Sequence, residues 1–160
     1  MRKAVTLMLV FCVAILGVVA VEAQEENTSR IQGAWRVEGV SVRGGPNAGD
    51  NANPQPSIYI FAKKHYSIMF VPGEAPRPDA PEFAEMTDEQ MLESYRTFVA
   101  NSGTYEMEGN RIITHVVVAR VPNFVGETAE YQYRIEQGTL WLTQVGEEGV
   151  ETLTKLMRLE

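Results

Sequence analysis

Apolar and polar residues alternate along most of the chain after residue 33, in short runs that are separated by turn-forming residues. These runs cover residues 34–43, 57–62, 65–71, 103–108, 111–120, 127–136, 139–145 and 151–159. Alternation with a period of two is typical of strands that turn one face toward a core. The pattern therefore predicts an all-β, antiparallel domain of eight strands.

Three of the connections between these runs are very short, at residues 63–64, 109–110 and 137–138. Glycine in the last two supplies the positive φ that tight hairpins require. Strands that are neighbours in the sequence are then neighbours in the sheet. Eight such strands lose their exposed edges most simply by closing on themselves. We therefore expect an up-and-down β-barrel, with a two-sheet sandwich as the alternative.

Two longer segments interrupt the strands, at residues 44–56 and 72–100. The first is rich in Gly, Pro and Asn and is predicted to be a loop. In the second, Thr87 and Gln90 fit a capping box at the start of a helix over residues 87–100. We expect this one short helix to lay an apolar side against the barrel. The apolar residues at helical spacing are Met91, Tyr95 and Phe98.

Residues 1–23 have the three-part pattern of a secretory signal peptide. Arg2 and Lys3 precede an apolar run, and Ala23 closes it before a polar stretch. A membrane anchor is the alternative, because the run is nearly long enough to cross a hydrocarbon core of roughly 30 Å. We expect cleavage after Ala23, which leaves one domain at residues 24–160 with no stable membrane anchor. The localisation would be secreted or periplasmic.

Charge and cysteine content exclude several classes of function. The formal net charge is −7, and loss of Arg2, Lys3 and Glu22 with the leader changes it to −8. Such a surface repels phosphate backbones, so we expect no nucleic-acid partner. Cys12 lies in the leader, which leaves the mature domain without thiol chemistry. The two histidines of the chain lack metal-ligand spacing, so we expect no metal site and no cofactor.

The first and last predicted strands carry a pair of residues that resembles the lipocalins. Gly33, Ala34 and Trp35 open the first strand, and Arg158 lies near the end of the last one. In lipocalins a Gly-x-Trp motif on the first strand is covered by an arginine from the far end of the barrel wall. The resemblance implies that the Arg158 guanidinium lies over the Trp35 ring and closes one end of the barrel through a cation–π contact.

The middle of the chain is similar to a family of bacterial and fungal lipocalin-like domains. The matching pieces are Gly103, Thr104 and Tyr105, then Thr114 and His115, then Pro122, Asn123, Phe124 and Gly126. The resemblance extends loosely from Gly33 to Arg158. It implies a barrel with an internal cavity, and it implies no particular reaction.

The strand over residues 127–136 indicates which side chains line this cavity. Tyr131 and Tyr133 share one face with Ala129 and Ile135, and polar and charged residues occupy the other face, so the tyrosines should point inward. Residues 121–126 contain proline and glycine and should form a turn at the rim of the barrel. The candidate ligand-binding residues are Tyr105, His115, Asn123, Phe124, Tyr131 and Tyr133.

His115 has two possible roles, because both faces of the strand over residues 111–120 are apolar and the alternation does not orient it. In the first, the imidazole lies in the cavity and forms a hydrogen bond or transfers a proton. In the second, it is a neutral core histidine that pairs with a tyrosine hydroxyl, such as that of Tyr105 or Tyr133.

Two functions from different classes follow from this sequence. The first is a secreted protein that binds a small hydrophobic molecule inside its barrel. The second is an isomerase or cyclase in which His115, Asn123 and a tyrosine hydroxyl polarise a carbonyl and move a proton. The sequence contains no candidate general acid and general base at the spacing of a catalytic motif. We therefore prefer the binding function.

Overall fold

The computed structural model of the protein describes residues 29–77, 79 and 81–160. The expected signal peptide and Cys12 lie outside the described residues. The strands are β1 (Gly33–Arg43), β2 (Gly49–Asn51), β3 (Ile58–Phe61), β4 (His65–Phe70), β5 (Val99–Glu108), β6 (Arg111–Ala119), β7 (Thr128–Glu136), β8 (Thr139–Val145) and β9 (Glu151–Arg158).

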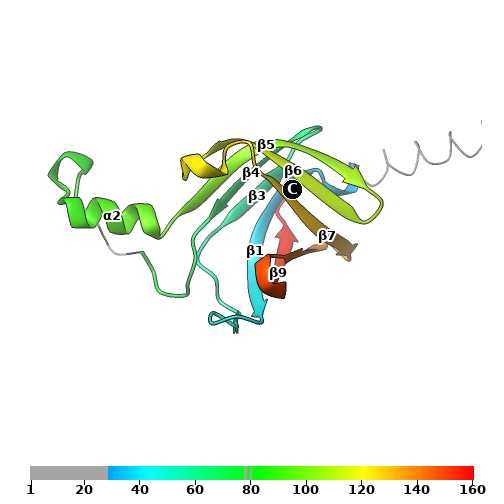
Figure 1. Cartoon of the computed structure of the whole chain (residues 1–160), viewed down its shortest axis with the longest axis horizontal. Helices are drawn as coiled ribbons and strands as arrows, with labels where there is room; N and C mark the ends of the chain where they lie inside the picture. The colour runs from blue at the N-terminus through cyan, green and yellow to red at the C-terminus, as the bar shows by residue number, and fades with distance from the viewer. Residues whose placement is uncertain (1–28, 78, 80) are drawn as a thin grey trace, which may run out of the picture.

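Eight of these strands form a closed antiparallel barrel (Figure 1). From β3 to β9 each strand pairs with the next one in sequence, and β1 pairs with both β3 and β9. The ladder between β1 and β9 runs from Trp35 opposite Arg158 to Arg43 opposite Glu151. It closes the barrel, so the predicted up-and-down architecture is confirmed and the sandwich alternative is wrong.

The short strand β2 departs from the prediction, because it lies inside the segment that was expected to be a loop. Residues Gly49, Asp50 and Asn51 pair with the second half of β1, beyond the part that pairs with β3. This strand contains no apolar residue, so the alternation of side chains gives no signal for it. Backbone pairing and an ion pair between Arg43 and Asp50 at 2.8 Å hold it in place.

The connections divide the barrel into two different ends. The tight hairpins β3–β4, β5–β6 and β7–β8 all lie at the end where β1 begins. The hairpin after β7 uses positive φ angles of 48° at Gln137 and 77° at Gly138. The other end carries the long connections, which contain the helix α2 (Asp88–Arg96) and three 3₁₀ turns. These turns are η1 (Phe83–Glu85), η2 (Pro122–Phe124) and η3 (Glu147–Gly149).

The helix α2 begins as predicted and then differs in its end and in its packing. The capping box of Thr87 and Gln90 is present, but the helix ends at Arg96 rather than at residue 100. From Val99 onward the chain pairs with β4, and this pairing overrides the local helical pattern. No residue of α2 is buried, and the helix stands clear of the barrel (Figure 1). The expectation that it packs against the sheet is wrong.

The closed end of the barrel is built around Trp35, which is completely buried. The Arg158 guanidinium carbon lies 4.1 Å from the centre of its ring, as the lipocalin resemblance implied. Arg158 also donates to the backbone carbonyls of Gln32, at 2.6 Å, and Arg30. The indole nitrogen of Trp35 donates to the Ile31 carbonyl at 2.8 Å. These bonds tie the segment before β1 to the end of β9.

Gly33 is required at this end for a steric reason. A Cβ atom at this position would lie 2.4 Å from the Glu160 carbonyl oxygen and 2.7 Å from an Arg158 nitrogen. Its φ of 134° is also unfavourable for other residues. The glycine of the Gly-x-Trp motif therefore makes room for the arginine that covers the tryptophan.

Candidate functional site

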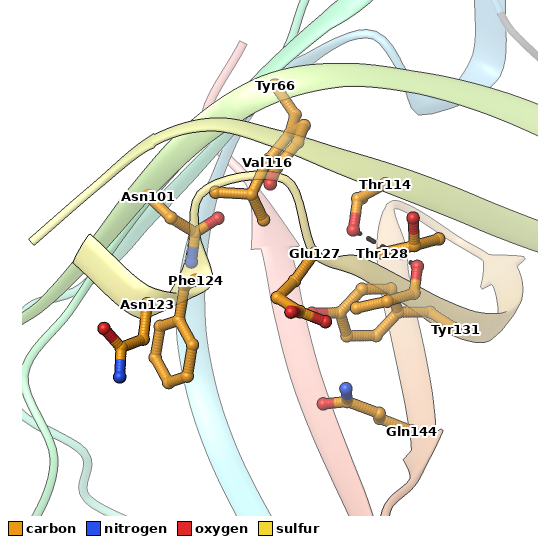
Figure 2. Close-up of a pocket in the computed structure, with 11 residues that line it drawn as sticks. Tyr66, Asn101, Thr114, Val116, Asn123, Phe124, Glu127, Thr128, Tyr131 and Gln144 are labelled. Carbon is orange, nitrogen blue, oxygen red and sulfur yellow. Dashed lines mark hydrogen bonds between the residues drawn. The ribbon is translucent and has the colours of Figure 1, made fainter. Parts of the chain in front are cut away.

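A cavity of about 640 Å³ lies at the end of the barrel opposite Trp35, where the long connections meet (Figure 2). Side chains from strands β4 to β8 and from η2 surround it. They are Tyr66, Asn101, Thr114, Val116, Asn123, Phe124, Glu127, Thr128, Ala129, Tyr131 and Gln144. A volume of this size is typical of small-molecule sites.

Tyr66 reaches the cavity from β4, where alternation turns Tyr66 and Ile68 inward. Its backbone lies opposite Gly103 on β5. A Cβ atom at Gly103 would lie 1.9 Å from the carbonyl oxygen of His115, so only glycine allows β5 and β6 to approach this closely. A break in the β5–β6 register occurs between Ser102 and Gly103. The Gly-Thr-Tyr motif thus marks a close contact in the cavity wall.

The Tyr66 hydroxyl is buried and lacks a hydrogen-bond partner among the described residues. The residue is only 2% exposed. Burial raises the pKa of this phenol, and an interaction with the Thr114 side chain, whose geometry is not that of a hydrogen bond, partly offsets that rise. The Thr114 hydroxyl itself donates to the Ala129 carbonyl at 3.2 Å. A buried polar group without a partner is uncommon and calls for a functional explanation.

Tyr131 supplies a second hydroxyl to the cavity from β7. Tyr131 and Tyr133 are both partly buried against the core, so the predicted inward orientation of these tyrosines is confirmed. Burial raises the pKa of Tyr131 to about 12, and the neighbouring Tyr66 adds to this rise. Within the described part of the chain no hydrogen bond to the Tyr131 hydroxyl is formed. It therefore remains a neutral donor at physiological pH.

The mouth of the cavity is formed by η2 and the start of β7. Gly126 has a φ of 89°, and its amide donates to the Val116 carbonyl at 2.9 Å, which turns the chain back toward the barrel. The predicted rim turn is confirmed. Asn123 and Phe124 stand on it and are exposed, and Glu127, which is also exposed, follows the turn and lines the cavity. None of the lining residues is Lys, Arg or His.

His115 lies on the outer face of the barrel, and both of its predicted locations are therefore wrong. Its side chain is 47% exposed, and its Nε2 atom lies 3.3 Å from the Glu106 carboxylate. Its Nδ1 atom lies 3.3 Å from the Thr128 hydroxyl. The inward positions of β6 here are Ile112 and Thr114. Both faces of the strand look apolar in the sequence, which is why alternation could not place the imidazole.

The other predicted site residues divide between the two ends of the barrel. Asn123, Phe124 and Tyr131 line the cavity. Tyr105 lies in the core, where its hydroxyl donates to the Ala62 carbonyl at 2.8 Å. The Tyr133 hydroxyl donates to the Gly109 carbonyl at 3.3 Å, at the hairpin end. Neither of these two lines the cavity, and a binding role for the remaining three stays a prediction.

Several residues of the cavity wall were not predicted from the sequence. Tyr66 could have been found, because Tyr66 and Ile68 alternate with the polar residues His65 and Ser67 along β4. Asn101 and Gln144 gave no signal. Each is a polar residue close to one end of its strand, and only the closed barrel brings the two together.

Two further properties concern the described residues alone. No group of three or more His, Cys, Asp or Glu side chains in this part of the chain is arranged to hold a metal ion. None of its helices combines the length and apolar character that crossing a membrane requires.

Comparison with known proteins identifies a family that the sequence matches. The profile of a family described as a lipocalin-like domain matches residues 32–158. Similar solved structures include a lipocalin-like protein from Bacteroides uniformis, with 12% identity and a TM-score of 0.46 over 81% of this chain and 98% of that one. A redesigned β-barrel has 9% identity and a TM-score of 0.46 over 83% and 95% of the two chains. A search of curated proteins found no match.

Proposed function

Because the chain belongs to the lipocalin-like domain family, we propose that it binds a small molecule in the cavity at the open end of its barrel. The observation that carries this proposal is the cavity of about 640 Å³ with the unpartnered hydroxyl of Tyr66 in its wall. Cavities of this size that combine apolar walls with a few polar groups are typical ligand sites.

The wall combines apolar and polar surface, which suits a ligand with an apolar body and polar groups. Val116, Phe124 and Ala129 contribute apolar surface, and the rings of Tyr66 and Tyr131 add aromatic faces. Burial of the apolar part of the ligand supplies most of the affinity, and the hydroxyls fix its orientation. The isomerase or cyclase alternative loses its main proton-transfer group, since His115 lies on the outside of the barrel.

We also propose that the protein acts outside the cytoplasm after loss of residues 1–23. The basic start, the apolar run and Ala23 support this localisation. Expression of the full chain followed by N-terminal sequencing of the exported form tests it. We expect Gln24 as the first residue, and retention of Met1 on a membrane-bound form would contradict the proposal.

The binding proposal can be tested with N-phenyl-1-naphthylamine, an uncharged probe whose fluorescence rises in apolar sites. We expect saturable binding to the wild type and at least a tenfold loss of affinity in Val116→Trp, because the indole fills the cavity. The matched control is Val117→Trp. Val117 is the next residue on β6, is 64% exposed and does not line the cavity. This control should bind the probe like the wild type.

Equal probe affinity in the two variants, or no saturable binding to the wild type, would contradict the proposal. Thermal denaturation of both variants shows whether each one is folded. Mass spectrometry of organic extracts from the purified wild type and Val116→Trp can then identify a natural ligand. Such a compound should be retained by the wild type and lost from the variant.

A further inference from the structure

We propose that this cavity selects an uncharged ligand with a hydrogen-bond acceptor, such as a carbonyl oxygen, and disfavours carboxylates. The inference rests on the proposed function and names the chemical class of the ligand. Three features of the wall support this inference. They are the Tyr66 hydroxyl, the Tyr131 hydroxyl, and a lining that contains the Glu127 carboxylate and no Lys, Arg or His.

The Tyr66 hydroxyl provides the first donor. It is buried and has no hydrogen-bond partner among the described residues, so it loses its bonds to water without replacing them. An acceptor on a ligand restores this bond, whereas an apolar ligand leaves it unmade. The oxygen is covered by its neighbours. An acceptor therefore reaches it when these side chains shift slightly, as side chains at binding sites commonly do.

The Tyr131 hydroxyl provides the second donor, and it lies close enough to Tyr66 for the two phenols to influence each other electrostatically. A phenol near neutral pH is protonated, and burial raises the pKa of Tyr131 to about 12. Both groups can therefore donate at physiological pH. A carbonyl oxygen has two lone pairs and can accept a hydrogen bond from either phenol.

The charges of the wall argue against an anionic ligand. No Lys, Arg or His side chain lines the cavity, and the one ionisable carboxylate, Glu127, lies at its mouth. The chain as a whole carries a formal net charge of −7. A ligand carboxylate would enter without a counter-charge, and burial of an unpaired charge is strongly unfavourable. A neutral acceptor avoids this cost and still satisfies the tyrosines.

Three probes with one naphthalene frame separate these effects in calorimetric or fluorescence titrations. They are 2-acetonaphthone, which has a neutral acceptor, 2-isopropenylnaphthalene, which has the same shape without the acceptor, and 2-naphthoate, which is an anion. We expect the ketone to bind at least tenfold more tightly than the naphthoate. Tyr66→Phe and Tyr131→Phe should each lower ketone affinity relative to the isopropenyl compound, by about three- to tenfold for a lost hydrogen bond.

Matched variants show whether the selectivity comes from the cavity. Glu127→Gln should tighten naphthoate binding by about threefold or more. Glu106→Gln removes a negative charge on the outer face, beside His115, and should leave the affinity for naphthoate unchanged. Tyr105→Phe removes a hydroxyl that already has a partner outside the cavity, Ala62, and should leave the ratio of ketone to isopropenyl affinity unchanged.

The outcomes distinguish this inference from the proposed function. The inference is overturned if naphthoate binds as tightly as the ketone. It is also overturned if the ratio of ketone to isopropenyl affinity is unchanged in both Tyr66→Phe and Tyr131→Phe. In either case the cavity binds ligands without this selectivity. If N-phenyl-1-naphthylamine binds and none of the three probes does, the inference also fails. If that probe does not bind either, the proposed function fails with it.

Discussion

Tyr66 and Tyr105 are both buried in the barrel, yet their hydroxyls are in opposite situations. Tyr105 donates to the Ala62 carbonyl at 2.8 Å, and Tyr66 has no partner among the described residues. Removing a satisfied hydroxyl costs a hydrogen bond and leaves the carbonyl unpaired, whereas removing an unsatisfied one relieves a desolvation penalty. The same chemical change at the two positions should therefore have effects of opposite sign.

We expect Tyr66→Phe to raise the free energy of unfolding by about 1 kcal/mol and Tyr105→Phe to lower it by about 1 kcal/mol. Urea denaturation of the two variants and the wild type measures both changes. Equal destabilisation by the two substitutions would show that the Tyr66 hydroxyl is satisfied in solution.

Single residues of the site could be predicted only where one face of a strand is clearly polar. Tyr131 was placed correctly because polar and charged residues occupy the other face of β7. His115 was misplaced because β6 is apolar on both faces. A shift of one residue moves every side chain of a strand to the opposite face, so an error in orientation changes the whole candidate site.

At the scale of elements, the close pairing of β5 and β6 at Gly103 should make the protein's stability sensitive to substitution there. A Cβ atom there would lie 1.9 Å from the His115 carbonyl oxygen, which belongs to the backbone and cannot move aside as a side chain can. We expect Gly103→Ala to destabilise the protein by about 2 kcal/mol or more, in the range of overpacking effects.

Gly49→Ala is the matched control for this substitution. Gly49 also lies in a strand, and a Cβ atom there meets no atom within 4 Å. The midpoint of thermal denaturation of the Gly49→Ala variant should stay close to that of the wild type. If Gly103→Ala unfolds at the same temperature as Gly49→Ala, the close approach of β5 and β6 is not a constraint in solution.

The helix α2 shows which part of an element the local sequence determines. The capping box of Thr87 and Gln90 is a local interaction, and it correctly predicted where the helix begins. The end of the helix depends on pairing between Val99 and Phe70, which lie far apart in the sequence. Local helical spacing cannot anticipate such a contact, so the predicted helix was too long.

At the scale of the whole molecule, the closed end depends on Trp35. Trp35 and Trp141 form a matched pair, because each has an arginine over its ring, at 4.1 Å from Arg158 and 4.0 Å from Arg134. Trp35 is completely buried, whereas Trp141 points outward from β8 between the buried Leu140 and Leu142.

We expect Trp35→Ala to lower the free energy of unfolding by about 3 to 5 kcal/mol, as is usual for a buried aromatic residue. Trp141→Ala should cost about 1 kcal/mol, the scale of an exposed cation–π pair. Chemical denaturation of the two variants measures the difference. Similar losses would contradict the view that burial rather than the arginine contact gives Trp35 its importance.

The overall architecture was predictable because two independent signals agree on it. The alternation in eight runs predicted the strands, and the short turns at 109–110 and 137–138 predicted which of them are neighbours. The position of the cavity was less predictable, since it depends on which connections meet at one end of the closed barrel.

The ladder between β1 and β9 also determines the order in which the protein can fold. Its partners Trp35 and Arg158 are 123 positions apart in the sequence (158 − 35). The hairpins β3–β4, β5–β6 and β7–β8 need only local encounters, whereas closure must bring two distant strands together, so we expect closure to be the slow step. Until then, β1 and β9 each present an unpaired edge that can join the same strand of another molecule. Refolding at high protein concentration therefore sets ring closure in competition with aggregation.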